Sequence, residues 1–500
     1  MKNTIPFLTV HELSAKIRSG EITSREAVGA LIAHIRQYNP AFNAIVHINE
    51  KEALEKADEA DRAMVLGKSN GLLHGIPVTI KDTYCVKGMP ATAGHLPLKN
   101  HIPVDDAVLV RLLKDEGAII LGKTNTATLA MDMQTNNALF GSTNNPWDVT
   151  RTPAGSSGGC ATALATGMTP LSFGSDLAGS IRVPAAFCGV YGFKPTHGVL
   201  SLEGHIPPLP GDINGIRTMA VPGPMARSIA DLQLALTVLS RSNPYDRYVA
   251  PLAPDPGNAG EIKGLRITWT DHFGDVPVST EIRKKLQEYV TTLTRAGAIV
   301  EKAGPPAMDY NEVWELWGRF VGMQNGYEMS DFKRWIGDLF TRKKVRNIPM
   351  HRKVVGPISV GKMMKALELQ SKYVTMIDNF LSEYDAWICP VASTTAFRHH
   401  ACSSHLGDFK IYDTPLGIDG RQVPYYVATQ SCTTIFSVTN SPVLSMPIGL
   451  GESGLPVNIQ VAGRRHHDFR LLRVAALLDQ HAEKITYPLQ KQAITDQHIH

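Results

Sequence analysis

Apolar runs of strand length alternate with segments of helical pattern along most of this 500-residue chain. From Gly71 onward, helical patterns at 106–114 and 160–166 alternate with the apolar runs IPVTI, AIILG and TPLSFG. The same order returns after a proline-rich stretch at 242–260, and strand-like runs return near the C-terminus. Because helices and strands that alternate must bury their apolar faces against each other, the pattern predicts an α/β protein.

The composition narrows the class of protein further. Hydrophobic residues make up 43% of the chain and charged residues 19%, which excludes a disordered chain, a collagen and a coiled coil. The length alone allows about three domains or one unusually large one. The formal net charge is only +4, spread without runs of like charge, so we expect neither a nucleic-acid partner nor an anionic membrane surface.

The cysteines and the N-terminus bear on location. Six cysteines without close pairing make a disulfide framework improbable and favour a reducing compartment. The first twenty residues lack an apolar signal region, and no stretch of 18 apolar residues could span a membrane. We therefore expect a cytoplasmic protein.

Several helix boundaries can be predicted from single residues. Thr9 with Glu12, and Thr23 with Glu26, form capping boxes, and Pro40 is expected to end the second helix.

Two predictions concern the second half of the chain. The segment 313–364 carries Trp314, Trp317 and Trp335 at helical spacing, which favours helices packed in the core over a ligand site. Asp468 is expected to cap the last helix.

Two loops rich in glycine and serine, at 155–159 and 174–180, each lead into a helix. Backbone N–H groups at a helix start can hold an anion or a developing oxyanion. A phosphate-binding loop is disfavoured, because the Lys-[Ser/Thr] of a P-loop is missing. The alternative is that the glycines only permit tight packing of helix against strand.

A serine in such a loop needs a base before it can act as a nucleophile. Ser180 lies in Ala-Gly-Ser-Ile-Arg, so the Gly-x-Ser-x-Gly elbow of α/β-hydrolases is absent. The remaining candidate is Lys81, at the end of an apolar strand where burial would lower the pKa of its amine. The alternative for Lys81 is an ordinary ion pair with Asp82 or a strand-end lysine that reaches solvent.

Ordered motifs along the chain resemble those of the amidase signature family. They are GIPVTIKD, GKTN, FGSTNNPW, GSSGG, GSD, GSIRVPAAFCG, GFKPTHG, VPGPMAR and LPVNIQVAG. The likeness spans nearly the whole chain; its signature core lies at about 71–230, and the region at about 240–438 is less diagnostic. The resemblance implies a single amidase domain over 1–500, with a mixed central β-sheet covered by helices on both sides.

The resemblance also implies a catalytic triad without a metal or an organic cofactor. Ser180 is then the acyl-forming nucleophile, Ser156 the bridging serine on a cis peptide, and Lys81 the terminal base. Their separations match the family pattern: Lys81 and Ser156 are 75 residues apart, and Ser156 and Ser180 are 24 residues apart.

Further residues are carried over with supporting roles. The oxyanion hole consists of the backbone N–H groups of Leu177, Ala178, Gly179 and Ser180. Asp176 and Arg182 are expected to hold the loops, although an ordinary salt bridge between them is equally consistent, and Ser157 is expected to be a supporting hydroxyl. Ala130 and Met131 align with the acyl-pocket wall, although the residue pattern alone would place Met131 in the core. The sequence departs from the family where Leu177-Ala178 replaces the usual Thr-Gly, and alanine resists the unusual φ that glycine accepts.

The predicted activity is that of an amidohydrolase, an amidase that converts a small carboxamide to a carboxylate and ammonia or an amine. One alternative is the glutaminase-type subunit of a tRNA-dependent amidotransferase, and another is a non-catalytic anion-binding module. The segment Thr218-Met-Ala-Val-Pro-Gly-Pro, in place of the Asp-Gln-Ile-Gly-Pro common in that subunit, favours the stand-alone enzyme. A homodimer is left open. The cluster from His399 to His405 could suggest zinc, but its spacing favours a solvated loop.

Overall fold

The computed structural model describes residues 5–492 except 212–217, 242–245, 247–248, 253–259, 327–328, 342, 344, 355 and 407–408.

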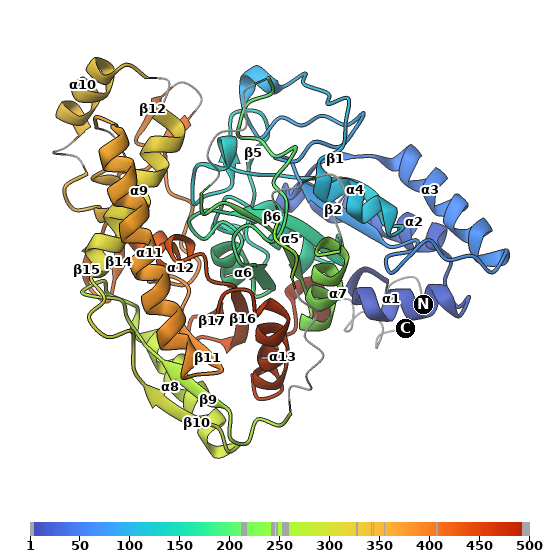
Figure 1. Cartoon of the computed structure of the whole chain (residues 1–500). Helices are drawn as coiled ribbons and strands as arrows, with labels where there is room; N and C mark the ends of the chain where they lie inside the picture. The colour runs from blue at the N-terminus through green and yellow to red at the C-terminus, as the bar shows by residue number, and fades with distance from the viewer. Residues whose placement is uncertain are drawn as a thin grey trace.

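One mixed β-sheet runs through the described residues and joins strands from both ends of the chain (Figure 1). Its eleven strands within that part are, in spatial order, β1 (Ile45–Ile48), β3 (Ile119–Thr124), β2 (Pro77–Lys81), β6 (Leu171–Asp176), β8 (Val221–Ala226), β7 (Tyr191–Lys194), β16 (Val443–Leu450), β17 (Pro456–Ala462), β11 (Ala386–Pro390), β9 (Arg266–Trp269) and β10 (Ile299–Lys302). β2 pairs in parallel with β3 and β6, whereas β6 pairs antiparallel with β8. The predicted α/β class with a mixed central sheet is therefore confirmed.

Helices connect and cover these strands. They are α1 (Val10–Arg18), α2 (Ser24–Phe42), α3 (Glu50–Val65), α4 (Val108–Asp115), α5 (Gly158–Ala165), α6 (Arg182–Cys188), α7 (Ile229–Leu239), α8 (Thr280–Arg295), α9 (Tyr310–Gly326), α10 (Asp331–Thr341), α11 (Val360–Ser382), α12 (Tyr425–Val438) and α13 (Asp468–Asp479), with 3-10 turns η1 (Ile5–Phe7), η2 (Leu96–Leu98), η3 (Thr128–Ala130) and η4 (Pro349–His351). Three small hairpins, β4 (Asn136–Asn137) with β5 (Gly141–Ser142), β12 (Ser404–Leu406) with β13 (Phe409–Ile411), and β14 (Leu416–Ile418) with β15 (Arg421–Val423), lie outside the main sheet.

Side-chain alternation along the strands gives the sheet two buried faces. In β2, Val78 and Ile80 belong to the hydrophobic cluster that contains residues of α1, α4, α7, α8 and α13. Thr79 and Lys81 point to the other face, because successive side chains of a strand alternate. On that second face lie clusters built from α5 and α6 and from α9, α11 and α12. Helices thus cover both faces of the sheet.

The local predictions at the N-terminus hold in part. Both capping boxes are present, at Thr9 and at Thr23. Pro40, however, lies inside α2, and the prediction that it ends the helix is wrong. The helix ends at Asn43, which adopts a left-handed conformation, while the Asn39 side chain accepts hydrogen bonds from the next two backbone N–H groups.

Two predictions in the second half need correction. Trp314 and Trp317 are buried, but Trp335 is 53% exposed, because α10 presents that side chain to solvent. Asp468 is the first residue of α13, and it makes no capping bond within the helix. Its carboxylate instead accepts hydrogen bonds from the backbone N–H and the hydroxyl of Thr196.

Two further observations concern the chain as a whole. All six cysteines carry free thiols. Of the helices in the described ranges, none combines the length and the apolar character needed to cross a bilayer.

Candidate active site

Lys81 lies at the end of β2, between β3 and β6, and its side chain is fully buried. Its Nζ lies 2.6 Å from Ser156 Oγ and 3.1 Å from Ser175 Oγ. Burial lowers the pKa of the Lys81 amine to about 7, against the opposing influence of the Cys160 thiol and the Asp176 carboxylate. A large fraction of Lys81 is therefore neutral at neutral pH, and a neutral amine can accept a proton.

Neighbouring backbone lies so close to Gly155 and Gly159, on either side of Ser156, that a side chain would not fit at either position. The Gly155–Ser156 peptide bond is cis. A Cβ on Gly155 would lie 2.7 Å from the Asp132 carbonyl oxygen, and one on Gly159 would lie 2.5 Å from the Asn125 backbone. The Thr135 hydroxyl donates to the carbonyl of Ser156 at 3.3 Å. These contacts fix the position of the Ser156 hydroxyl above Lys81.

The second loop follows β6 and brings Ser180 beside the first. The N–H of Ser157 donates to the Ser180 carbonyl oxygen at 3.1 Å, which ties the two loops together. The Ser157 hydroxyl faces the Ser175 carbonyl oxygen at 3.4 Å. Ser180 is 6% exposed, whereas Ser156 is fully buried. Ser180 is therefore the more open of the two. Within the described residues, no hydrogen bond joins the hydroxyls of Ser180 and Ser156.

A buried ion pair holds the Ser180 loop in place. Arg182 donates to both carboxylate oxygens of Asp176, from Nη2 at 2.8 Å and from Nε at 3.0 Å. Its Nη1 donates to the Thr433 carbonyl and to Gln460 Oε1. The Arg182 guanidinium, with other neighbours, holds the pKa of Asp176 at about 2 although burial opposes this shift. Such a bidentate, charge-assisted arrangement positions the loop firmly.

Some backbone N–H groups of the Ser180 loop already donate a hydrogen bond within the protein, and others do not. Gly179 N–H donates to Asp176 Oδ1 at 2.8 Å. Among the described residues, no acceptor lies within hydrogen-bond range of the N–H groups of Leu177, Ala178 and Ser180. Only Gly179 in this loop has a left-handed φ, of 114°, and a Cβ there would lie 2.6 Å from Thr433 Oγ1. Ala178 is not in that region, so alanine replaces the family's glycine there without backbone strain.

Comparisons with known proteins show the family of this chain. The family model described as Amidase matches residues 26–472. The chain is 31% identical to a glutamyl-tRNA(Gln) amidotransferase subunit of Lachnoclostridium phytofermentans, with 95% of this chain and 97% of that protein covered. It is 30% identical to an acylamidase of Rhodococcus erythropolis, with 95% of both chains covered. The chain belongs to the amidase family.

A solved structure supports the fold of this amidase. A bacterial aryl acylamidase of the amidase signature family superposes with a TM-score of 0.78, over 98% of each chain, at 24% identity. The predicted family and fold are therefore confirmed.

The residues aligned with the acyl-pocket wall lie in a loop beside Ser156. The N–H of Ala127 donates to the Ser156 carbonyl at 3.4 Å, and Ala130 follows in the same turn with a φ of 59°. Met131 is 44% exposed, so the pattern-based placement of Met131 in the core is wrong. It directly follows the short 3-10 turn η3 and does not lie on a packed helix face, which residue spacing alone could not show.

Side chains from distant segments also contact this site, and the residue pattern does not mark them. Trp317 on α9 donates from Nε1 to the Leu177 carbonyl at 3.1 Å. Thr433 on α12 donates to the Ala178 carbonyl at 2.6 Å. His205 lies 2.9 Å from Ser175 Oγ through its Nε2. No motif marks these residues, because their positions depend on how remote helices and loops pack.

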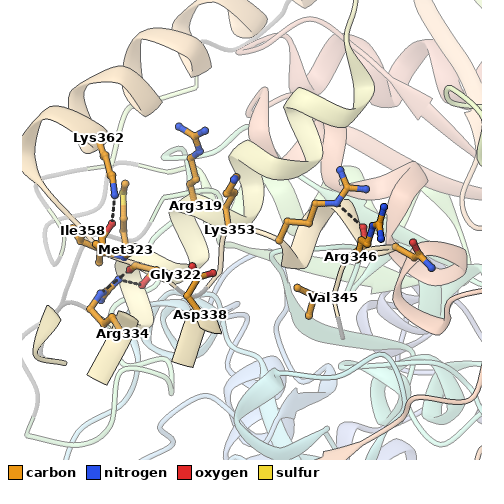
Figure 2. A pocket seen from close by; sticks show the side chains of 14 residues that line it. Arg319, Gly322, Met323, Arg334, Asp338, Val345, Arg346, Lys353, Ile358 and Lys362 are labelled. Carbon is orange, nitrogen blue, oxygen red and sulfur yellow. Dashed lines mark hydrogen bonds between the residues drawn. The ribbon is translucent and has the colours of Figure 1, made fainter. Parts of the chain in front are cut away.

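A cavity of about 830 Å³ lies apart from these residues, between α9, α10, η4 and the start of α11 (Figure 2). Arg319, Arg346 and Lys353 line it, and among the described residues of its lining Asp338 is the one acidic side chain. None of the predicted site residues borders this cavity.

The histidine cluster does not gather ligands for a metal. His399 Nε2 faces Asn144 Oδ1 at 3.0 Å, and Cys402 Sγ lies 3.7 Å from His405 Nε2. Across the parts of the chain that the structure describes, no group of three potential metal ligands occurs.

Proposed function

We propose that this amidase hydrolyses a carboxamide through a serine acyl-enzyme, with Ser180 as nucleophile, Ser156 as relay and Lys81 as base. One observation carries the proposal: a buried lysine with a pKa lowered to about 7 lies 2.6 Å from the Ser156 hydroxyl. A lysine in an ordinary surface ion pair would keep a high pKa and would not face a serine in a second buried loop.

The proton transfers of the proposed reaction balance as follows. Ser180 Oγ attacks the amide carbon while its proton passes to Ser156 Oγ, and the Ser156 proton passes to Lys81 Nζ. When the tetrahedral intermediate collapses, the C–N bond breaks and Ser156 donates a proton to the departing nitrogen. Lys81 then returns its proton to Ser156. Water attacks the acyl-enzyme by the same route in reverse and releases the carboxylate.

The oxyanion hole in this proposal uses the open N–H groups of Leu177, Ala178 and Ser180. Gly179 contributes through its left-handed conformation, since its own N–H is bonded to Asp176. Asp176 with Arg182 positions the hole through that bond. Removing one donor of such a hole typically costs about 10²–10³ in kcat.

The remaining assignments follow from the same proposal. Ser157 supports the Ser180 loop through its backbone, and Ala130 and Met131 form part of the acyl-pocket wall. We propose one amidase domain for the whole chain, since strands from 45 to 462 share one sheet. The cytoplasmic location and a homodimer stay predictions.

A second candidate function is that of an amidotransferase component. The similarity to the amidotransferase subunit of Lachnoclostridium phytofermentans supports it, and the 30% identity to an acylamidase is nearly equal. The two functions differ in what they require: a stand-alone amidase hydrolyses simple amides alone, whereas the amidotransferase component hydrolyses glutamine within an assembly. Hydrolysis of glutamine only after addition of further subunits would favour the second function.

A fluorophosphonate label tests the assignment without knowledge of the substrate. The probe should attach to a peptide that contains Ser180, and Ser180→Ala should abolish both labelling and hydrolysis of a chromogenic anilide. Ser240→Ala, at the end of α7, is the matched control and should behave as wild type. An adduct on a cysteine, or an active Ser180→Ala variant, contradicts the proposal. A folded wild type that takes no label favours the anion-binding module.

A further inference from the structure

His205 lies at the far end of a hydrogen-bonded chain that starts at Ser156. Lys81 Nζ faces Ser156 Oγ on one side and Ser175 Oγ on the other, at 2.6 and 3.1 Å. His205 Nε2 lies 2.9 Å from the same Ser175 Oγ, and His205 Nδ1 lies 3.1 Å from the Pro207 carbonyl oxygen. Ser175 is 6% exposed, and Lys81 is fully buried.

The segment that carries His205 is fixed to the residues that follow Lys81. Cys85 N–H donates to the Gly204 carbonyl at 2.9 Å, and Ile206 N–H donates to the Thr83 carbonyl at 2.7 Å. The rings of Tyr84 and His205 pack edge to face, with centroids 4.8 Å apart. His205 is therefore held on the same stretch of backbone that positions the lysine.

The Pro207 carbonyl assigns the proton of neutral His205 to Nδ1, because a carbonyl oxygen can only accept. Nε2 is then an acceptor, and the Ser175 hydroxyl donates to it. The lone pairs of Ser175 Oγ are left to accept an N–H from Lys81. A neutral amine has one lone pair and two N–H groups, so with one N–H on Ser175 the Lys81 lone pair stays free to accept a proton from Ser156.

Protonation of His205 reverses the direction of this chain. Nε2–H then donates to Ser175 Oγ, and the Ser175 hydroxyl turns to donate to the lone pair of Lys81. That lone pair is no longer available to Ser156.

We infer that His205 is a positioning residue of the amidase, which acts through Ser175 to orient the base Lys81 and stops catalysis when it is protonated. This inference rests on the proposed function. It makes the reaction depend on two ionisations in place of one. Among the described residues, the titratable groups beside the chain include Tyr84 next to His205, and Cys160 and Asp176 next to Lys81.

The pH dependence of fluorophosphonate labelling, measured as kinact/KI, tests this arrangement. Two groups must lose a proton in the wild type, so log(kinact/KI) should rise with a limiting slope of two at low pH. His205→Gln offers Ser175 a side-chain oxygen that does not ionise. It should keep the plateau within a few-fold and reduce the slope to one.

Two further variants separate positioning from packing. His205→Phe keeps a ring against Tyr84 but removes both nitrogens, so the plateau should fall about tenfold to a hundredfold, as expected for a misplaced base. Ser175→Ala should give the same loss with His205 intact, and Ser175→Thr, which keeps the hydroxyl, should restore labelling. His34→Phe is the matched control, since His34 is a partly buried histidine with one hydrogen bond, to the Thr166 carbonyl, far along the chain.

A thermal unfolding transition, measured for each variant, serves as the control that the variant is folded. A wild-type slope of one, or a His205→Gln profile that superposes on the wild type, overturns the role of His205 alone if Ser180 is still labelled. A wild type in which Ser180 takes no label overturns the proposed function and this inference together.

Discussion

The charged residues of the candidate site, which lies in the central region at residues 71–230, differ in burial from Arg319 and Lys353 in the outer segment at residues 310–382. In the central region Lys81, Asp176 and Arg182 are buried, and each has polar partners within 3.1 Å. In the outer segment Arg319 and Lys353 line an open cavity, within the part of the chain where Figure 1 shows α9, α10 and α11 together. A buried charge persists only where every contact is satisfied, so the central region tolerates little change. Arg319 and Lys353, which are not buried, can vary without such a cost.

This difference suggests a division of roles. The proposed chemistry depends on short, fixed distances, which a rigid buried centre supplies. Trp317 of the outer segment reaches that centre through its hydrogen bond to the Leu177 carbonyl. We therefore expect substitutions in the central region to change rate or stability by orders of magnitude, and matched substitutions in the outer segment to have small effects.

Lys81→Met should show the largest effect. Methionine fills a similar volume but cannot accept a proton, so hydrolysis should fall about 10³-fold to 10⁴-fold. In the wild type kcat/KM should rise through pH 7 to a plateau, because the ammonium form that dominates below the Lys81 pKa of about 7 is inactive. The variant should lack this limb.

The measurement is kcat/KM against pH for both proteins on one anilide. Lys353→Met, at an exposed lysine of the outer segment, is the control and should keep the wild-type profile. An unchanged ascending limb with comparable rate in Lys81→Met would show that the base lies elsewhere.

Arg182→Met and Arg352→Met compare the two regions in stability. The first leaves the Asp176 carboxylate buried and unpaired, which should cost about 3–5 kcal/mol. Arg352 pairs with Glu315 at 3.2 Å, but the two side chains are 37% and 26% exposed. That pair should contribute no more than about 1 kcal/mol.

Urea unfolding of both variants at pH 7 measures these costs. The double variant that combines Arg182→Met with Asp176→Asn should recover part of the lost stability, because it no longer has the unpaired carboxylate of Asp176. Equal destabilisation by the two single variants would remove the distinction between the regions.

The sequence predicted helices in the outer segment and the burial of Trp314 and Trp317, but not the exposure of Trp335. For the central region it offered residues grouped in motifs, and the reason is physical. Lys81, Ser156 and Ser180 lie in motifs whose glycines are needed locally, as the contacts of Gly155 and Gly159 show. Their proximity still needed the family resemblance, since residue pattern alone left Lys81 as an ordinary strand-end lysine.

Other features could not be obtained from local sequence. The exposure of Trp335 and of Met131 depends on which face of a short element meets the core. The contact of His205 with Ser175 joins residues 30 positions apart through a loop that has no recognisable motif. Helical spacing and composition carry no information on such packing.

Trp317→Phe and Trp335→Phe place the same substitution at two positions of the outer segment. Trp317 loses the hydrogen bond from Nε1 to the Leu177 carbonyl, so kcat should fall by about fivefold, which corresponds to roughly 1 kcal/mol. Trp335 is 53% exposed and should tolerate phenylalanine without a measurable change. Steady-state kinetics on one anilide compares them. A larger effect at Trp335 would mean that α10 takes part in substrate binding.

Chelation should have the smallest effect of all, namely none. The proposed proton transfers from Ser180 through Ser156 to Lys81 contain no step that needs a Lewis acid, so EDTA and phenanthroline should leave kcat/KM unchanged. The segment from His399 to His405 offers the competing chemistry, yet His399 faces Asn144, and only Cys402 and His405 lie near each other in the described part of that segment. If chelation abolished activity, zinc restored it and Cys402→Ala lacked it, the reaction would be assigned to that segment and not to the central region. Activity that survives chelation but not Ser180→Ala would assign it to the buried serines.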